Sequence, residues 1–198
     1  NANRSIPYPR GKTLGGSSSI NGLLYIRGQE EDYNIWRQLG NKGWGWDDVL
    51  PYFLKAENQE RGKSKFHNVG GPLSVSDTRI KLDLLETFMD AAEEKGIPKV
   101  DDFNTGDNFG CGYFQVTEKN GLRCSAAVGY LNPIKNRKNL KIEINCHVKK
   151  INFKGNKAFS VSFWKDDQLI NVAANNEIIL SAGSIGTPQI LQTSGIGD

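Results

Sequence analysis

Two adjacent glycines followed by a run of serines form the segment of this chain that is best suited to hold a ligand. Gly15-Gly16 and Ser17-Ser18-Ser19 carry little or no side chain, so a flat or phosphorylated molecule can approach the backbone N–H groups closely. The same composition also occurs in flexible linkers. Here, however, Arg10 and nearby prolines precede the run, and the apolar residues 23–26 follow it. Because both ends are anchored in this way, we favour a ligand-binding loop.

Two common motifs are excluded at this loop. Gly11-Lys12-Thr13 is similar to the end of a phosphate-binding P-loop, but Ile6 stands where that motif requires a glycine. The Gly-x-Ser-x-Gly motif of hydrolases is also absent, because Ser19 occupies the place of the closing glycine. We therefore expect neither a P-loop nucleotide site nor a nucleophilic role for Ser17.

A second segment with small side chains lies near the C-terminal end. Residues 177–181 form an almost continuous apolar run, which is typical of a buried parallel strand. Ala182-Gly183-Ser184 follows, and Thr187 and Pro188 then suit the N-cap and first residue of a helix. A bend between a strand and a helix N-terminus is a common place for a phosphate or a flat ring. The sequence thus predicts a second ligand-contacting bend.

The two segments resemble, in the same order, the two signatures of the glucose-methanol-choline (GMC) oxidoreductases, which depend on FAD. Between them, residues 43–46 and 70–77 are similar to the choline and alcohol dehydrogenase branch of that family. The matching signature residues are Gly11, Leu14, Gly15, Gly16, Ser17, Ser18, Ile20, Asn21, Tyr25, Gly28 and Asn34 in the first, and Gly183, Ser184, Thr187, Pro188, Ile190, Leu191, Ser194, Gly195, Ile196 and Gly197 in the second.

The resemblance implies a set of FAD contacts. It places Val148 at the adenine, whereas the adjacent His147 is structural on the family pattern. Some family members bind FAD covalently through a histidine just before the signature asparagine; Ile20 stands there in this chain, so we expect non-covalent FAD. The residues implied to contact the cofactor are Thr13, Gly15, Gly16, Ser17 and Ser18 along FAD, Asn21, Gly22, Leu23 and Leu24 near the isoalloxazine ring, Val148 at the adenine, and Ala182, Gly183 and Ser184 on the adenosine side.

The resemblance also implies an activity. It is the oxidation of an alcohol, choline-like or primary, to the carbonyl by hydride transfer to flavin N5. The catalytic histidine of the family lies beyond the second signature, so we assign no catalytic residue here. The chain also lacks Gly-x-Gly-x-x-Gly, begins at Asn1 and ends at Asp198, and we expect it to be an internal piece of a longer protein. Two alternatives stay open: a non-redox family member such as a lyase, and a catalytically inert fragment of the fold.

Composition narrows the classes of partner. With 25 basic and 22 acidic residues and a net charge of +3, the chain has no charge excess suited to nucleic acid. No apolar run approaches 18 residues, and we expect a cytoplasmic protein, with any membrane association through parts outside this chain. Asp101, Asp102 and Asp107 lack the spacing of a calcium loop, so we predict no metal. The expected partners are a small-molecule alcohol and an electron acceptor of unknown identity.

The expected fold class is α/β of mixed type: part of an FAD-binding Rossmann-like domain, plus part of a substrate-binding domain with an antiparallel sheet and helices. We assign residues 1–69 and 139–198 to the first and residues 70–138 to the second. Apolar periodicity predicts helices over residues 30–39, from Asp47 as N-cap to about residue 57, from residue 77 or 78 to 95, over 123–131 and from 188. Alternation predicts strands near residues 73–77, 113–117, 140–144, 148–153, 158–164 and 169–172.

Two further expectations concern single features. We place His67 in an exposed polar loop over residues 58–68, as a surface residue rather than a base or ligand. We interpret the apolar stripe that contains Leu84, Leu85 and Phe88 as ordinary helix core.

Overall fold

The computed structural model describes residues 4–197. The chain divides into two compact units, Asn1–Arg137 and Lys138–Asp198, and each is described by itself below. The terminal residues Asn1 and Asp198, on which the expectation of an internal piece partly rests, lie outside the described residues. The assignment of residues 1–69, 70–138 and 139–198 to parts of two domains stays a prediction.

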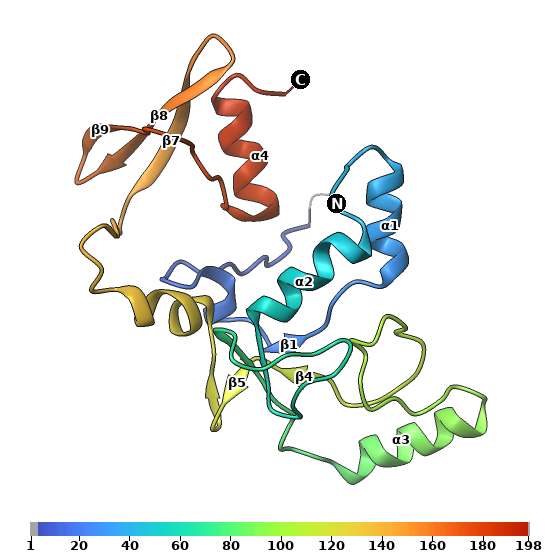
Figure 1. Cartoon of the computed structure of the whole chain (residues 1–198). Coiled ribbons are helices and arrows are strands. Elements are labelled where there is room, and N and C mark those ends of the chain that lie inside the picture. The colour runs from blue at the N-terminus through green and yellow to red at the C-terminus, as the bar shows by residue number, and fades with distance from the viewer. Residues whose placement is uncertain (1–3, 198) are drawn as a thin grey trace. The chain divides into compact units, whose positions relative to one another are not determined.

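The first unit combines helices with small sheets (Figure 1). This combination confirms the mixed helix-and-strand class. The α-helices are α1 (Glu30–Gln38), α2 (Trp46–Ala56) and α3 (Asp83–Glu94), and the short helices are η1 (Gly16–Ser19), η2 (Ala127–Leu131) and η3 (Asn132–Ile134). The strands are β1 (Leu24–Tyr25), β2 (Glu57–Gln59), β3 (Leu73–Val75), β4 (Gln115–Val116), β5 (Glu118–Lys119) and β6 (Leu122–Arg123).

Helices α1 and α2 begin with the same kind of cap. The backbone N–H of Gln29 donates to Asp32, at 2.8 Å, and that of Gly45 donates to Asp48, at 3.0 Å. The N-cap of α2 is therefore Gly45, and the prediction of Asp47 was wrong by two positions because the carboxylate three residues beyond the cap completes the turn.

Aromatic packing joins the two helices. Tyr33 is buried on α1, and its ring centroid lies 5.4 to 5.8 Å from those of Trp36, Trp46 and Phe53. Such ring pairs contribute beyond their buried area. The pairing holds α1 against α2. Because β2 follows directly after Ala56, the end of α2, this contact also fixes the place at which β2 begins.

Short strands connect distant parts of this unit. Strand β1 pairs antiparallel with β4, with Leu24 opposite Val116, and β2 pairs parallel with β3, with Glu57 opposite Leu73. Val116 also forms a bridge with Ser76. Strand β5 pairs with β6 as a hairpin. Residues just after the glycine-serine loop are thereby joined to two segments far along the chain.

Predictions for two further helices of this unit were also wrong. Helix α3 begins at Asp83 rather than at residue 77 or 78, and its apolar stripe is not core: Leu84 is 78% and Phe88 64% exposed. Periodicity predicts an apolar face but not what covers that face. Arg123 ends strand β6, because Glu118 pairs with it across the hairpin, and the helix that follows starts only at Ala127.

The second unit is a meander with one helix. Strands β7 (His147–Lys154), β8 (Lys157–Lys165) and β9 (Gln168–Ala173) form an antiparallel sheet in sequence order, as predicted. Helix α4 (Gly183–Thr193) packs on β7, where the backbone N–H of Ile151 donates to Ser194 Oγ at 2.8 Å. Ile151 is buried in this contact.

Several predictions for this unit were wrong. Within the described residues, 140–144 and 177–181 form no strand, and Ile179 is 78% exposed. A parallel strand needs neighbouring strands to satisfy its backbone, and the described part of the chain pairs none with residues 177–181. The N-cap of α4 is Ala182 rather than Thr187, and Pro188 lies inside the helix.

None of the helices described within residues 4–197 is both long enough and apolar enough to cross a membrane.

Candidate functional site

The glycine-serine loop folds into a tight turn followed by helix η1. Gly15 and Gly16 adopt φ values of 89° and 55°, and the Gly16 N–H donates to the carbonyl of Thr13 at 2.9 Å. At a φ of 89° any side chain is strained, and a Cβ on Gly15 would also lie 2.4 Å from Ser19 Oγ, so this position favours glycine. The two glycines are thus used for conformation, as a ligand-binding loop requires, rather than for flexibility.

Long-range hydrogen bonds hold this loop in place. The guanidinium of Arg123 donates through Nη1 to the carbonyl of Ser18, at 3.0 Å, and to Asn21 Oδ1, at 2.7 Å. The backbone N–H of Ala126 donates to Ser18 Oγ at 2.9 Å. These partners lie more than 100 residues away, and the sequence carried no signal that Arg123 would reach the loop. They show that the loop is an ordered part of the first unit.

The outer surface of the loop is open and partly apolar. No atom lies within 4 Å of the position that a Cβ would take on Gly16 or on Gly22. Leu14, Ile20 and Leu24 are all about half exposed around this bare backbone. A bare backbone edged by apolar side chains is a surface on which a flat, largely apolar ring can lie. The residues present therefore fit a cofactor that contains such a ring.

The C-terminal bend belongs to the second unit. Gly183 adopts a φ of 82°, Ser184 is exposed, and the Ala182 N–H donates to Thr187 Oγ1 at 3.1 Å. Val148 is half-buried in β7, opposite Phe163. The convergence of this bend with the glycine-serine loop on one ligand stays a prediction.

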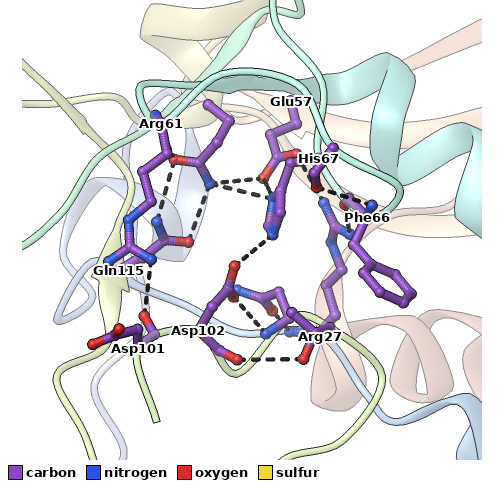
Figure 2. A network of polar contacts seen from close by, with 12 residues as sticks. Arg27, Glu57, Arg61, Phe66, His67, Asp101, Asp102 and Gln115 are labelled. Carbon is purple, nitrogen blue, oxygen red and sulfur yellow. Dashed lines mark hydrogen bonds and ion pairs between the residues drawn. The ribbon is translucent and has the colours of Figure 1, made fainter.

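A buried cluster of charges in the first unit was missed by sequence reasoning. Figure 2 shows Arg27, Glu57, His67 and Asp102 in contact. Arg27 Nη2 lies 3.0 Å from Glu57 Oε2, His67 Nδ1 lies 2.9 Å from Glu57 Oε1, and His67 Nε2 lies 2.8 Å from Asp102 Oδ2. The side chain of Glu57 has no solvent exposure. We call these four residues the ionic cluster.

Amide side chains extend the ionic cluster on one side. Gln59 Nε2 contacts Glu57 Oε1 at 3.3 Å and Gln115 Oε1 at 3.1 Å. Gln115 in turn donates to Asp77 at 3.1 Å, and Asp77 forms a half-exposed ion pair with Arg61 at 2.7 Å. Charged and amide groups from β2, from β4 and from the residues just after β2 and β3 are thereby linked into one network.

The prediction that His67 is a surface residue was wrong. Its side chain is only 6% exposed, and hydrogen bonds to two carboxylates surround it. Burial disfavours the charged imidazole, but the hydrogen bonds to Asp102 and Glu57 outweigh burial and raise the pKa of His67 from 6.5 to about 9. The same contact with His67 helps to hold the pKa of Asp102 below its ordinary value against its burial. His67 is therefore an imidazolium at neutral pH.

The ionic cluster leaves little trace in the sequence. Its members lie in β2, in loops and after β1, at separations from 10 to 75 residues along the chain. No periodic pattern links such positions. The polar composition of residues 58–68 indicated an exposed loop, because composition does not report that distant carboxylates bury a histidine within it.

Among residues 4–197, no group of three or more His, Cys, Asp or Glu side chains is arranged to hold a metal ion. Asp102 and Asp107, in the acidic loop, instead accept hydrogen bonds from the backbone N–H groups of Asn104 and Phe109.

Comparison with known proteins gives consistent matches along the chain. The family described as GMC oxidoreductase matches residues 1–198. The chain is 43% identical over 197 residues to an alcohol dehydrogenase [acceptor] of Pseudomonas putida, covering 98% of this chain and 36% of that protein. It is 40% identical to the mitochondrial choline dehydrogenase of Mus musculus, covering 98% of this chain and 33% of that protein. The chain thus spans about a third of the length of these curated relatives.

Solved structures show the same similarity. An FAD-dependent oxidoreductase from Chaetomium thermophilum superposes with a TM-score of 0.91 at 32% identity, covering 98% of this chain and 36% of that one. A formate oxidase from Aspergillus oryzae, studied for its FAD modification, superposes with a TM-score of 0.81 at 28% identity, covering 96% of this chain and 34% of that one. The family match over all residues and the identity to the curated relatives lead to one conclusion. This chain belongs to the GMC oxidoreductase family.

Proposed function

We propose that this chain is the flavin-facing part of an FAD-dependent oxidoreductase that converts an alcohol, choline-like or primary, to its carbonyl. The observation that carries the proposal is the glycine-serine loop: an open, bare backbone between Thr13 and Leu24, ordered by Arg123, in a chain of this family. The relatives named alcohol dehydrogenase and choline dehydrogenase support the substrate class.

The proposal assigns the cofactor contacts by segment. Residues 13–18 lie along FAD, with Gly15 and Gly16 allowing close approach of the backbone. Residues 21–24 lie near the isoalloxazine ring, and residues 182–184 and Val148 contact the adenosine side. When bound, FAD supplies the hydride acceptor at N5. What these residues contribute is orientation, because a hydride acceptor works only when the substrate carbon is held close to it.

Hydrogen bonds within the chain suit this positioning role. Asn21 Oδ1 accepts from the Leu23 N–H at 3.2 Å, and Leu23 adopts a φ of 69°, which turns the backbone sharply beside Gly22. Thr117 donates to the Leu23 carbonyl through its backbone N–H, at 2.8 Å, and through Oγ1, at 3.1 Å. The Asn21 side chain and Thr117 thus fix the segment proposed to lie nearest the ring.

Non-covalent attachment of FAD is part of the proposal. Ile20 stands immediately before Asn21, and an isoleucine side chain has no atom that can form a bond to flavin. Precipitating the purified protein with acid tests this assignment. We expect the yellow colour in the supernatant, and a flavin that stays with the precipitate would contradict it.

Anaerobic reduction tests the activity. The purified full-length protein is expected to show flavin absorption that bleaches on addition of choline or a primary alcohol. A protein that binds no flavin would overturn the cofactor assignment, whereas bound flavin that no alcohol reduces would favour the non-redox alternative.

The partners and location follow as part of the same proposal. We propose a small-molecule alcohol as substrate, an electron acceptor of unidentified class, and residence in the cytoplasm. Because the mouse relative carries the word mitochondrial in its name, cell fractionation with detection of the native protein is the direct test of location.

A further inference from the structure

The ionic cluster joins the segments that hold the backbone just after the proposed ring-facing residues. The Arg27 guanidinium donates to the Phe66 carbonyl at 2.6 Å and pairs with Glu57 at 3.0 Å. The Arg27 backbone N–H donates to Asn104 Oδ1 at 2.7 Å, and Asn104 Nδ2 donates to the Tyr25 carbonyl at 3.2 Å. Residues 25–27 are therefore held by two loops at once: one binds the Arg27 side chain, and the other binds the backbone.

His67 connects these two loops. As an imidazolium it donates from Nδ1 to Glu57, which pairs with Arg27, and from Nε2 to Asp102. Asp102 Oδ1 then accepts from the Asn104 backbone N–H at 2.8 Å. A continuous series of hydrogen bonds thus runs from His67 through Asp102 to the side chain that holds residues 25–27.

This backbone continues directly into the segment that we place near the ring. Leu24 and Tyr25 form β1, so the pairing with β4 holds Leu24 at a fixed place next to Leu23. A displacement of Tyr25 or Arg27 would pass into residues 21–24, since Leu24 and Tyr25 are adjacent residues of β1. Packed side chains and hydrogen bonds are the physical means by which such a displacement travels.

We propose that His67 is a positioning residue for the flavin: by bridging Glu57 and Asp102 it fixes the backbone of residues 25–27, and with it the ring-facing residues 21–24. This inference rests on the proposed function. His67 touches none of the proposed cofactor-contacting residues and acts through the segments that it ties together.

Charge makes the bridge dependent on the protonation of His67. Loss of one imidazole proton removes one of the two donated hydrogen bonds and leaves the carboxylates facing each other with less compensating charge. The carboxylates of Glu57 and Asp102 face His67 directly. Arg27 and Tyr25 lie against Glu57, Arg61 lies near Asp102, and Asp77 pairs with Arg61.

The first test measures the backbone itself. Hydrogen–deuterium exchange is compared between the purified full-length protein and its H67Q and D102N variants, in peptides that cover residues 21–27. We expect exchange there to be about tenfold faster in both variants, because the closed state loses a hydrogen bond to an ionised group. The matched control is D90N, which removes an exposed carboxylate of α3 that pairs with Lys99. It should leave the exchange rate of these peptides unchanged.

The second test measures the flavin. Visible circular dichroism reports the surroundings of the ring, and we expect a transition near pH 9 in the wild type that is absent in H67Q. Ionisation of the flavin itself would give a transition in both proteins, so the comparison separates it from the titration of His67. If H67Q fails to fold, D102N takes its place, because Asp102 is partly exposed. Loss of that carboxylate should move the transition to lower pH.

The outcomes separate this inference from the function on which it rests. Wild-type protein without flavin would overturn the proposed function before any variant is compared. Bound flavin with unchanged exchange at residues 21–27 in the variants would overturn the positioning role alone. Faster exchange with an unchanged flavin signal would also overturn it, because His67 would then serve only the fold.

Discussion

The glycine-serine loop and the ionic cluster lie in the same unit, yet they are built by opposite means. The loop has little side chain, is open to solvent, and owes its shape to the φ values of Gly15 and Gly16. The ionic cluster is almost entirely side chain, is buried, and owes its shape to contacts among residues far apart in the sequence. The comparison shows that a loop shaped by its own backbone and a cluster shaped by distant side chains have different sequence signatures: the first is local and the second is not.

The largest effect on stability should come from a change in the ionic cluster. Glu57→Ala removes the carboxylate that faces both Arg27 and His67, leaving two buried cations without that partner. We expect a loss of about 3–5 kcal/mol in the free energy of unfolding. Chemical denaturation followed by circular dichroism measures it.

Its control is Arg79→Ala, which breaks the exposed pair with Glu60 and leaves the hydrogen bond from the Asp77 backbone N–H to Glu60 in place. That change should cost less than about 1 kcal/mol. Equal losses for the two variants would show that the ionic cluster contributes no more than a surface pair.

The pH dependence of stability is a second test of the ionic cluster. The folded-state pKa of His67 is raised from 6.5 to about 9, so its contribution is complete below pH 6.5 and is lost as the pH rises through 9. The shift corresponds to about 3 kcal/mol. The free-energy difference between wild type and H67Q should therefore narrow by about that amount from pH 6 to pH 10. A constant difference across this range would contradict a raised pKa.

On the loop side, we expect Gly16→Val to reduce flavin affinity by about tenfold or more. A β-branched residue at a φ of 55° is strained, and its side chain would fill the open space above the backbone. Equilibrium dialysis of FAD measures the change.

Gly155→Val is a closely matched control. Gly155 has a φ of 59°, also has no atom within 4 Å of its Cβ position, and lies in the turn between β7 and β8. The Gly155→Val protein should carry the same backbone strain and keep its FAD affinity. A Gly16→Val protein that is yellow and fully loaded with FAD would count against the assigned site.

A smaller effect is expected at Arg123, which holds the loop from the other end of the first unit's sequence. Arg123→Gln loses the charged donor to the Ser18 carbonyl and to Asn21 Oδ1. A charge-assisted hydrogen bond of this kind contributes about 1.5–3 kcal/mol before the remaining contacts compensate, and we expect a loss of about three- to tenfold in FAD affinity. Arg79→Gln, at an exposed arginine of the same unit, should leave the affinity unchanged.

Much of the local structure could be predicted from the sequence. The helix over residues 30–38 and the β7–β9 meander follow from apolar periods that each segment carries in itself. The first loop could be located because glycines in adjacent positions and a family signature are both local features. The boundaries of α2, α3 and α4 were less predictable, because caps depend on which of several competing side chains completes the first turn.

By itself, the order of amino acids determined where this protein can bend its backbone and expose it: glycine permits positive φ whatever the rest of the chain does. Only the tertiary structure decided which charges are buried together. His67 is an imidazolium because Glu57, ten residues before it, and Asp102, 35 residues after it, face it from opposite sides. Burial and pairing are properties of the space around a side chain, and that space is assembled from parts of the chain that no local pattern connects.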